Sequence, residues 1–223
     1  MGNYYNEKLN SNSLVKIYET DIPRIRQFLT AEIDFVKSNL KKTDRILEVA
    51  SGYGRILKAL SESARCLTGI DISEDFVNLS KDYLKDCKNC KTMTMDVHTM
   101  DFTEPFDVIL CLQNGLSAVK GVPEETIKRC LDFLKPQGKA YFSTYSSNFW
   151  NTRLEWFKEQ ADKGLLGEID DEKTKDGVII CKDGFKAITF TEEDFYNYGK
   201  ASQYPFTIEE VDESSLFLII TKP

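Results

Sequence analysis

The apolar residues of this chain follow two spacings that alternate over about 100 residues. Short, nearly continuous apolar runs, such as Phe106–Leu112, are typical of strands that are covered on both faces of a sheet. Between these runs, apolar residues recur every three or four positions, as Ile56, Leu57 and Leu60 do, and this spacing predicts helices. Strands are expected at 45–49, 65–71, 91–95, 106–112 and 139–145. Such alternation predicts an α/β fold, with a doubly wound, mostly parallel sheet and helices on both faces.

The regions on either side of this alternation follow other patterns. A helical pattern with Pro23 in its first turn precedes it. After it we expect an aromatic-rich helix at 148–162, a charged exposed loop around 158–176 and a hairpin at Asp183-Gly184. Thr191 to Asp194 resembles a capping box that starts another helix, and two closing strands follow, joined by a short turn and therefore antiparallel. We expect one domain, 1–223, divided into a helical cap (1–40), a core (41–147), a lid-like insertion with a hairpin (148–190) and a closing helix and strand pair (191–223).

Glycines and carboxylates cluster at the predicted carboxyl edge of the sheet. Gly52-Tyr53-Gly54 follows the first strand, and glycine lets the main chain come close to a ligand. Asp71 ends the next strand about 20 residues later, where doubly wound folds place a carboxylate that bonds ribose hydroxyls. Asp96 and the residues after Leu112 lie at the same edge. The sequence therefore predicts a nucleotide or cofactor site in the core, whereas Leu57, in the place of a third glycine, argues against a dinucleotide.

Composition and charge narrow the classes of function. The net charge of −7 disfavours nucleic acid and anionic membrane surfaces as partners. No run approaches the roughly 18 apolar residues that span a bilayer, and the first residues lack the pattern of a signal peptide, so a cytoplasmic protein is expected. The single histidine, His98, gives little support to a Ser-His-Asp hydrolase. Cys87 and Cys90 have no second pair at metal spacing, and we expect no metal site.

The core resembles the class I S-adenosylmethionine-dependent methyltransferases, the seven-stranded, Rossmann-like group. The resemblance covers roughly residues 41–147 and the closing strand pair. It rests on the segments 48–55, 69–71, 95–97, 106–112 and 134–138. Ala50 replaces the first glycine of the family's first motif. The resemblance implies an antiparallel last strand, S-adenosylmethionine as cofactor and S-adenosylhomocysteine as product.

The same resemblance implies roles for individual residues. Ala50 and Gly52 would let the main chain approach the methionine part of the cofactor, Asp71 would accept both ribose hydroxyls, and Asp96 would accept the adenine amino group beside the Val97 N–H. Glu48 would order the turn or hold a water, and a buried structural acceptor is an equal alternative. The full expected cofactor set is Tyr18, Glu48, Ala50, Ser51, Gly52, Gly54, Arg55, Asp71, Ile72, Asp96, Val97, Cys111, Leu112 and Gln113.

The reaction implied is in-line methyl transfer to a small-molecule acceptor, in which the protein supplies alignment and a dry pocket. A general base is needed only for a protonated acceptor, and Asn114, His98 and Tyr145 are the candidate catalytic residues. The acceptor pocket is expected from residues 113–115, Tyr145, the helix near Trp150, and the N-terminal tyrosines. Those tyrosines are Tyr4, Tyr5 and Tyr18. We expect the N-terminal segment and residues 148–190 to fold over the cofactor.

Two other functions stay open, a nicotinamide-dependent oxidoreductase and a non-catalytic S-adenosylmethionine-binding protein. The protein is expected to be a monomer or a homodimer.

Overall fold

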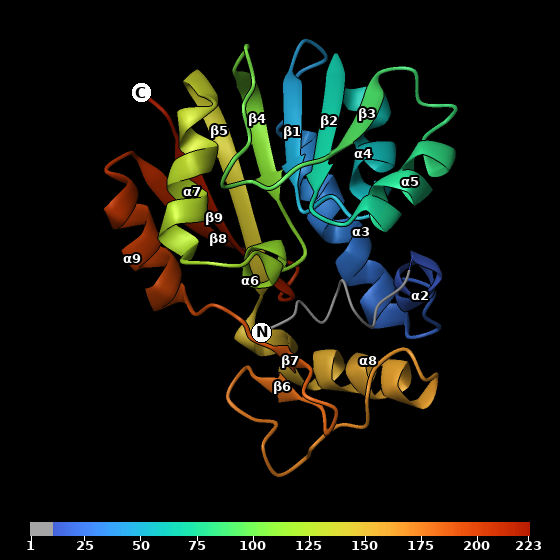
Figure 1. The fold of residues 1–223 in the computed structure, drawn as a ribbon. Helices are drawn as coiled ribbons and strands as arrows, with labels where there is room; N and C mark the ends of the chain where they lie inside the picture. Colours follow the sequence, from blue (N-terminus) through green and yellow to red (C-terminus); the bar gives the residue numbers. More distant parts are fainter. Residues whose placement is uncertain (1–10) are drawn as a thin grey trace.

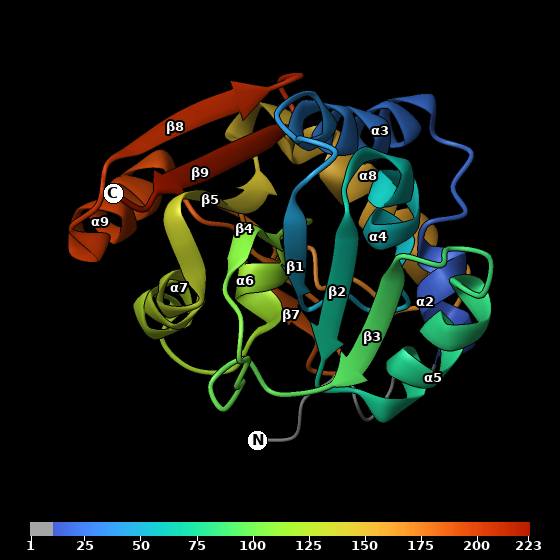
Figure 2. The same ribbon diagram turned by 90° about the horizontal axis from the view of Figure 1, so that it is seen from above.

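The central element of the fold is a seven-stranded sheet (Figure 1). The structure is a computed structural model, and it describes residues 11–223; Tyr4 and Tyr5 lie outside this range. The strands are β1 (Arg45–Val49), β2 (Cys66–Asp71), β3 (Cys90–Thr94), β4 (Phe106–Cys111), β5 (Leu134–Tyr145), β8 (Phe206–Val211) and β9 (Ser215–Thr221). Their order is β3-β2-β1-β4-β5-β9-β8, visible as a twisted sheet in Figure 2. The first five strands are parallel, and β9 runs antiparallel to both β5 and β8, which confirms the expected fold class.

Helices cover both faces because consecutive strand residues point to opposite sides. Ile46 of β1 packs in one buried cluster with residues of α3 and α4, whereas the next residue, Leu47, packs in another with residues of α7 and α9. Figure 1 shows α3, α4 and α5 on one side of the sheet and α7 and α9 on the other. The bounds are α3 (Pro23–Ser38), α4 (Arg55–Leu60), the short 3-10 helix η1 (Ser61–Ser63), α5 (Glu74–Tyr83), α6 (Gly115–Ala118), α7 (Pro123–Asp132) and α9 (Glu192–Ser202).

The insertion after β5 lies beyond the carboxyl ends of the parallel strands (Figure 1). It contains η2 (Ser147–Phe149), α8 (Trp150–Asp162), β6 (Ile179–Ile180) and β7 (Lys186–Ala187). Its aromatic residues Phe149, Trp156 and Phe185 are buried together with Phe28 of α3. The indole Nε1 of Trp156 also donates a hydrogen bond to the carbonyl of Ile17 at the end of α2 (Ser11–Ile17), at 3.2 Å. The insertion is thereby fastened to both N-terminal helices.

Two local expectations were wrong. The strand expected at 139–145 begins earlier, because Leu134 already pairs with Phe106 and the register then shifts, which makes residues 136–138 a bulge inside β5. Residues 158–176 are not an exposed loop throughout, because α8 continues to Asp162 and the side chains of Leu166 and Ile169 are buried. Turn-forming or charged residues dominate both segments, whereas their pairing and burial depend on residues that lie far away in sequence.

Other local predictions are confirmed. Residues Cys181 to Phe185 turn between the paired strands β6 and β7, and Thr191 and Asp194 form a reciprocal capping box at the start of α9. Among residues 11–223, no helix combines the length and the apolar content that crossing a membrane requires.

Candidate cofactor and acceptor site

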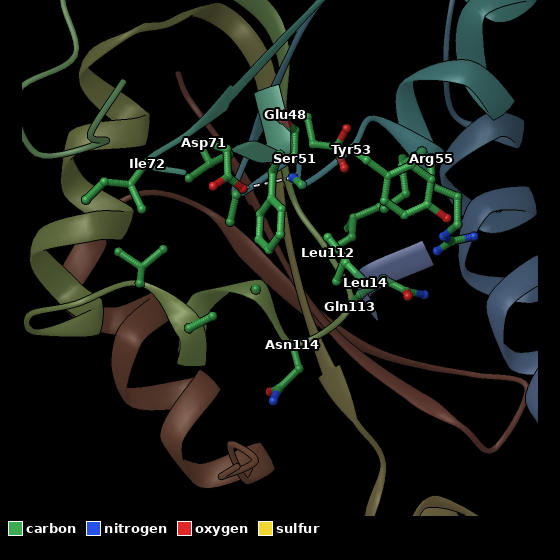
Figure 3. A pocket seen from close by; sticks show the side chains of 18 of the residues that line it. Leu14, Glu48, Ser51, Tyr53, Arg55, Asp71, Ile72, Leu112, Gln113 and Asn114 are labelled. Atoms are coloured by element: carbon green, nitrogen blue, oxygen red, sulfur yellow. Dashed lines mark hydrogen bonds between the residues drawn. The ribbon is translucent and has the colours of Figure 1, made fainter. Parts of the chain in front are cut away.

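A cavity of about 240 Å³ lies at the carboxyl ends of β1, β2 and β4, between the sheet, α2 and the insertion. Most of the residues expected at the site line it. They are Tyr18, Glu48, Ala50, Ser51, Gly52, Arg55, Asp71, Ile72, Asp96, Val97, His98, Leu112, Gln113, Asn114 and Tyr145. Gly54 and Cys111 do not line it. In Figure 3, Asp71 and Ile72 lie on one side of the cavity and Arg55 on the other, with Glu48 between them.

The turn after β1 has the tight main-chain geometry that its glycines suggested. Ala50, Gly52 and Gly54 all have positive φ angles, of 56°, 52° and 86°. Gly54 serves packing, because a Cβ there would lie 2.7 Å from Leu84 Cδ1, behind the turn. Cys111 is fully buried in the sheet core, below the cavity. These two residues therefore support the site without facing it.

Asp71 is held by two main-chain donors. Its Oδ2 accepts the N–H of Gly52 and its Oδ1 accepts the N–H of Ser73, both at 2.9 Å (Figure 3 shows the first). Burial raises the pKa of this carboxyl, and the N–H donors of Ser73 and Gly52 partly oppose the rise. The helix cap is supplied instead by Ser73, whose hydroxyl accepts the N–H of Phe76. Each carboxylate oxygen can accept a further hydrogen bond toward the cavity.

The acidic side chain of Glu48 and the basic side chain of Arg55 each have one buried polar atom without a hydrogen-bond partner in the described part of the chain. Glu48 is 3% exposed, and its Oε2 has no partner in the described part of the chain. Burial raises the pKa of Glu48 to about 8, although the Arg55 guanidinium lowers it. One terminal nitrogen of Arg55 is also buried and, within residues 11–223, unpartnered, while the guanidinium stacks 4.7 Å from the Tyr18 ring centroid. Buried polar groups are normally paired, so this arrangement fits a ligand that carries both a cation and an anion.

The loop after β3 forms the opposite end of the cavity. Asp96 Oδ1 accepts the N–H of His98, which leaves the second carboxylate oxygen available. The His98 ring Nε2 hydrogen-bonds the carbonyl of Lys120 at 2.6 Å. Ile72 is 48% exposed at this end, which is unusual for a large apolar side chain beside a cavity. This end of the cavity therefore presents a carboxylate, which can accept hydrogen bonds, and an apolar surface, against which a flat heteroaromatic ring can pack.

The residues after β4 are held in strained conformations by buried polar groups. Gln113 and Asn114 have φ angles of 55° and 60°. Glu32, fully buried on α3, accepts hydrogen bonds from the main-chain N–H and the side-chain amide of Gln113 at 3.2 and 2.9 Å. The Asn114 side-chain amide donates to Ser117 Oγ and to the Ile188 carbonyl, and its oxygen accepts from Thr144. These hydrogen bonds use both the donor and the acceptor of the side chain within the protein. With His98 also engaged, neither residue is placed as a free general base.

The sequence did not identify the residues that close the cavity. These are chiefly Leu14, Ile17, Tyr53, Trp156, Phe157, Gln160, Leu166, Phe185 and Ala187. Most are apolar, and in a sequence they cannot be told from core residues. The helix near Trp150, which was expected there, does line the cavity through Trp156, Phe157 and Gln160, whereas Trp150 itself packs against Arg153 and the buried cluster of the insertion. Among the described residues no three side chains of metal-binding type gather at one place.

Comparison with known proteins agrees with this geometry. Residues 46–138 match a family described as "Methyltransferase domain". The ubiquinone biosynthesis O-methyltransferase of Coxiella burnetii is 31% identical over 111 residues, which are 48% of this chain and 46% of the relative. The chain thus matches less than half the length of that relative.

Solved structures extend the fold match to nearly the whole chain. The magnesium protoporphyrin IX methyltransferase of Synechocystis PCC 6803, solved with S-adenosylhomocysteine, has a TM-score of 0.67 at 15% identity, with 99% of this chain and 96% of the other covered. The N-methyltransferase NodS of Bradyrhizobium japonicum WM9, also solved with S-adenosylhomocysteine, has a TM-score of 0.61 at 14% identity, covering 97% and 100%. Residues 46–138 are thus similar to a methyltransferase domain, and nearly the whole chain has the fold of these two methyltransferase structures.

Proposed function

We propose that this protein transfers the methyl group of S-adenosylmethionine to a small-molecule acceptor. The observation that carries the proposal is the pair Glu48 and Arg55, whose unpartnered polar atoms line the same cavity as Asp71. The methionine part of the cofactor bears an ammonium and a carboxylate, and the ribose bears two hydroxyls. Glu48 would bind the ammonium, Arg55 the carboxylate, and Asp71 the hydroxyl pair. Asp96 would accept the adenine amino group, with Ile72 and Val97 against the ring.

Leu57, in the place of the third glycine of the dinucleotide motif, argues against a nicotinamide dinucleotide. The comparisons named above are all with methyltransferases. The alternative is a protein that binds S-adenosylmethionine without catalysis, and only a measurement of methyl transfer distinguishes it from an enzyme.

The reaction would depend on position and on exclusion of water. When bound, the cofactor supplies a methyl group already activated on a positively charged sulfur. The chain's contribution is to fix the turn 50–52 and the strained pair Gln113 and Asn114 around the reacting centre, and to cover it with the insertion. The net charge of −7 and the cavity of about 240 Å³ support a small acceptor rather than a nucleic acid. The relative named as an O-methyltransferase makes hydroxyl acceptors the first to test.

Two measurements test the proposal. Thermal unfolding with S-adenosylhomocysteine should show a raised melting temperature, and NAD at the same concentration should show none. Transfer of labelled methyl from the cofactor to a panel of hydroxyl, amine, thiol and carboxylate acceptors should then identify a product. A shift with NAD alone would reject the cofactor, and a shift with S-adenosylhomocysteine without turnover on any acceptor would favour the binding protein.

A further inference from the structure

The insertion lines its part of the cavity with uncharged side chains, whereas the core lines the rest partly with charged ones. The acidic, basic and histidine residues that line the cavity in the described part of the chain all come from the core: Glu48, Arg55, Asp71, Asp96, His98 and Lys120. The insertion contributes Trp156, Phe157, Gln160, Leu166, Phe185 and Ala187, none of which carries a charge. The cavity therefore has an ionic side toward the sheet and an apolar, aromatic side toward α8 and β7.

Gln160 is the exception on the apolar side. The residue is 4% exposed and lines the cavity, and its side-chain amide makes no hydrogen bond to another described residue. The other polar group of this wall, the Trp156 indole N–H, is already bonded to the Ile17 carbonyl. The amide atoms of Gln160 are not among the buried polar atoms that lack a partner, so they reach the open space of the cavity, where a polar ligand group can bond them.

Arg153, a cation of the same helix, does not line the cavity. Arg153 lies two turns before Gln160 on α8 and is almost fully buried. Its guanidinium donates to the carbonyls of Gly177 and Ala187 and stacks on the rings of Tyr145 and Phe157. Tyr145 and Phe157 line the cavity, whereas Arg153 does not. The polar side chain that the insertion presents to the cavity is therefore the neutral amide of Gln160 and not an ion.

We propose that Gln160 determines acceptor specificity by hydrogen-bonding a neutral polar group, such as a hydroxyl or an amide, on a flat apolar acceptor that the aromatic wall covers. The inference rests on the proposed function, since it assigns the ionic side of the cavity to the cofactor. Apolar pockets discriminate weakly by shape, whereas a buried hydrogen-bonding group rejects ligands that lack its partner much more strongly. Gln160 would thereby favour neutral acceptors over apolar ones and over carboxylates.

Three probes that share one ethylbenzene frame test this in the protein saturated with S-adenosylhomocysteine: 4-ethylphenol, ethylbenzene and 4-ethylbenzoate. Calorimetry should show 4-ethylphenol binding most tightly. Gln160→Leu should weaken its binding about 10-fold or more and leave ethylbenzene unchanged. Asn151→Leu, an exposed amide replaced on the same helix, is the matched control and should change neither.

The outcomes separate this inference from the proposed function. If Gln160→Leu binds 4-ethylphenol as the natural chain does, or if the benzoate binds more tightly than the phenol, the inference is wrong. It is also wrong if no probe binds while S-adenosylhomocysteine does, or if Gln160→Leu lowers the affinity for S-adenosylhomocysteine itself. Failure of S-adenosylhomocysteine to bind the natural chain would instead reject the proposed function.

Discussion

The carboxylate of Asp71 at the end of β2 accepts a hydrogen bond from the main-chain N–H of Gly52, in the turn that follows β1. The bond ties together two loops that emerge from neighbouring parallel strands. It also orients the carboxylate along the cavity, since the second oxygen is fixed by Ser73. Asp71 therefore shapes the turn before any ligand arrives, and its structural and binding roles have to be separated by experiment.

Two substitutions at Asp71 separate these roles. Asp71→Asn keeps an oxygen that can accept from Gly52 and should cost less than about 1 kcal/mol of unfolding free energy, whereas Asp71→Ala should cost about 1–3 kcal/mol. Both should lose most of the thermal shift with S-adenosylhomocysteine, because a ribose diol needs two acceptor oxygens. Differential scanning fluorimetry with urea unfolding measures both quantities. A full ligand shift in Asp71→Ala would remove this residue from the ribose site.

The raised pKa of Glu48 predicts a pH-dependent stability. Burial lifts this pKa from 4.5 to about 8, so the folded protein holds a proton that the unfolded chain releases above about pH 4.5. The folded state is then favoured at low pH, and its stability falls as the pH rises from about 4.5 through 8. Urea unfolding should show a loss of about 2–4 kcal/mol over that window relative to Glu48→Gln. Equal pH profiles for the two proteins would contradict the raised pKa.

The raised pKa of Glu48 also predicts that proton release accompanies ligand binding. The ammonium of S-adenosylhomocysteine next to Glu48 would lower its pKa, so binding near pH 7 should release a proton. Calorimetry in two buffers of different ionisation enthalpy measures that release. Glu48→Gln should abolish it, and a release that persists in the variant would place the ammonium elsewhere.

The fold was predictable because its signals are local and repeated. Runs such as Phe106–Leu112 and the spacing of Ile56, Leu57 and Leu60 specify strands and helices before any tertiary contact is known. Connection rules for parallel strands then leave few arrangements, and the antiparallel closing pair follows from its short turn. The bulge at residues 136–138 escaped prediction because its pairing depends on β4, which lies far away in sequence.

The candidate site was predictable on its core side and not on its other side. Glycines and carboxylates at strand ends, such as Gly52 and Asp71, are recognisable because their chemistry is unusual for core positions. Gln160 and Phe185 carry no such signal, because one is a polar residue in a helix and the other an aromatic beside a turn. Glu32 also lies far in sequence from Gln113, which it holds. Only the folded chain brings these residues together.

Substitution of Arg55 tests whether this residue binds the amino-acid end of the cofactor. If its guanidinium binds the methionine carboxylate, Arg55→Met should weaken S-adenosylhomocysteine about 10- to 100-fold, the range expected for hydrogen bonds to charged groups. Methylthioadenosine, which lacks the amino acid, should bind equally to both proteins. Lys58→Met on the same helix is the control, since Lys58 stacks on Tyr83 outside the cavity. Equal weakening of both ligands by Arg55→Met would show a general disturbance of the site instead.

The insertion is expected to close over the bound cofactor, and proteolysis can detect this. Lys173 and Lys175 are exposed between α8 and β6, in a segment flanked by the lining residues Leu166 and Phe185. Because a ligand that contacts these flanks restrains the segment, saturating S-adenosylhomocysteine should slow tryptic cleavage there several-fold. Cleavage after the exposed Lys85, in the α5–β3 connection, should keep its rate and serves as the internal control. Slowing at both sites would mean global stabilisation, and unchanged cleavage at Lys173 and Lys175 would show that the insertion does not act as a lid.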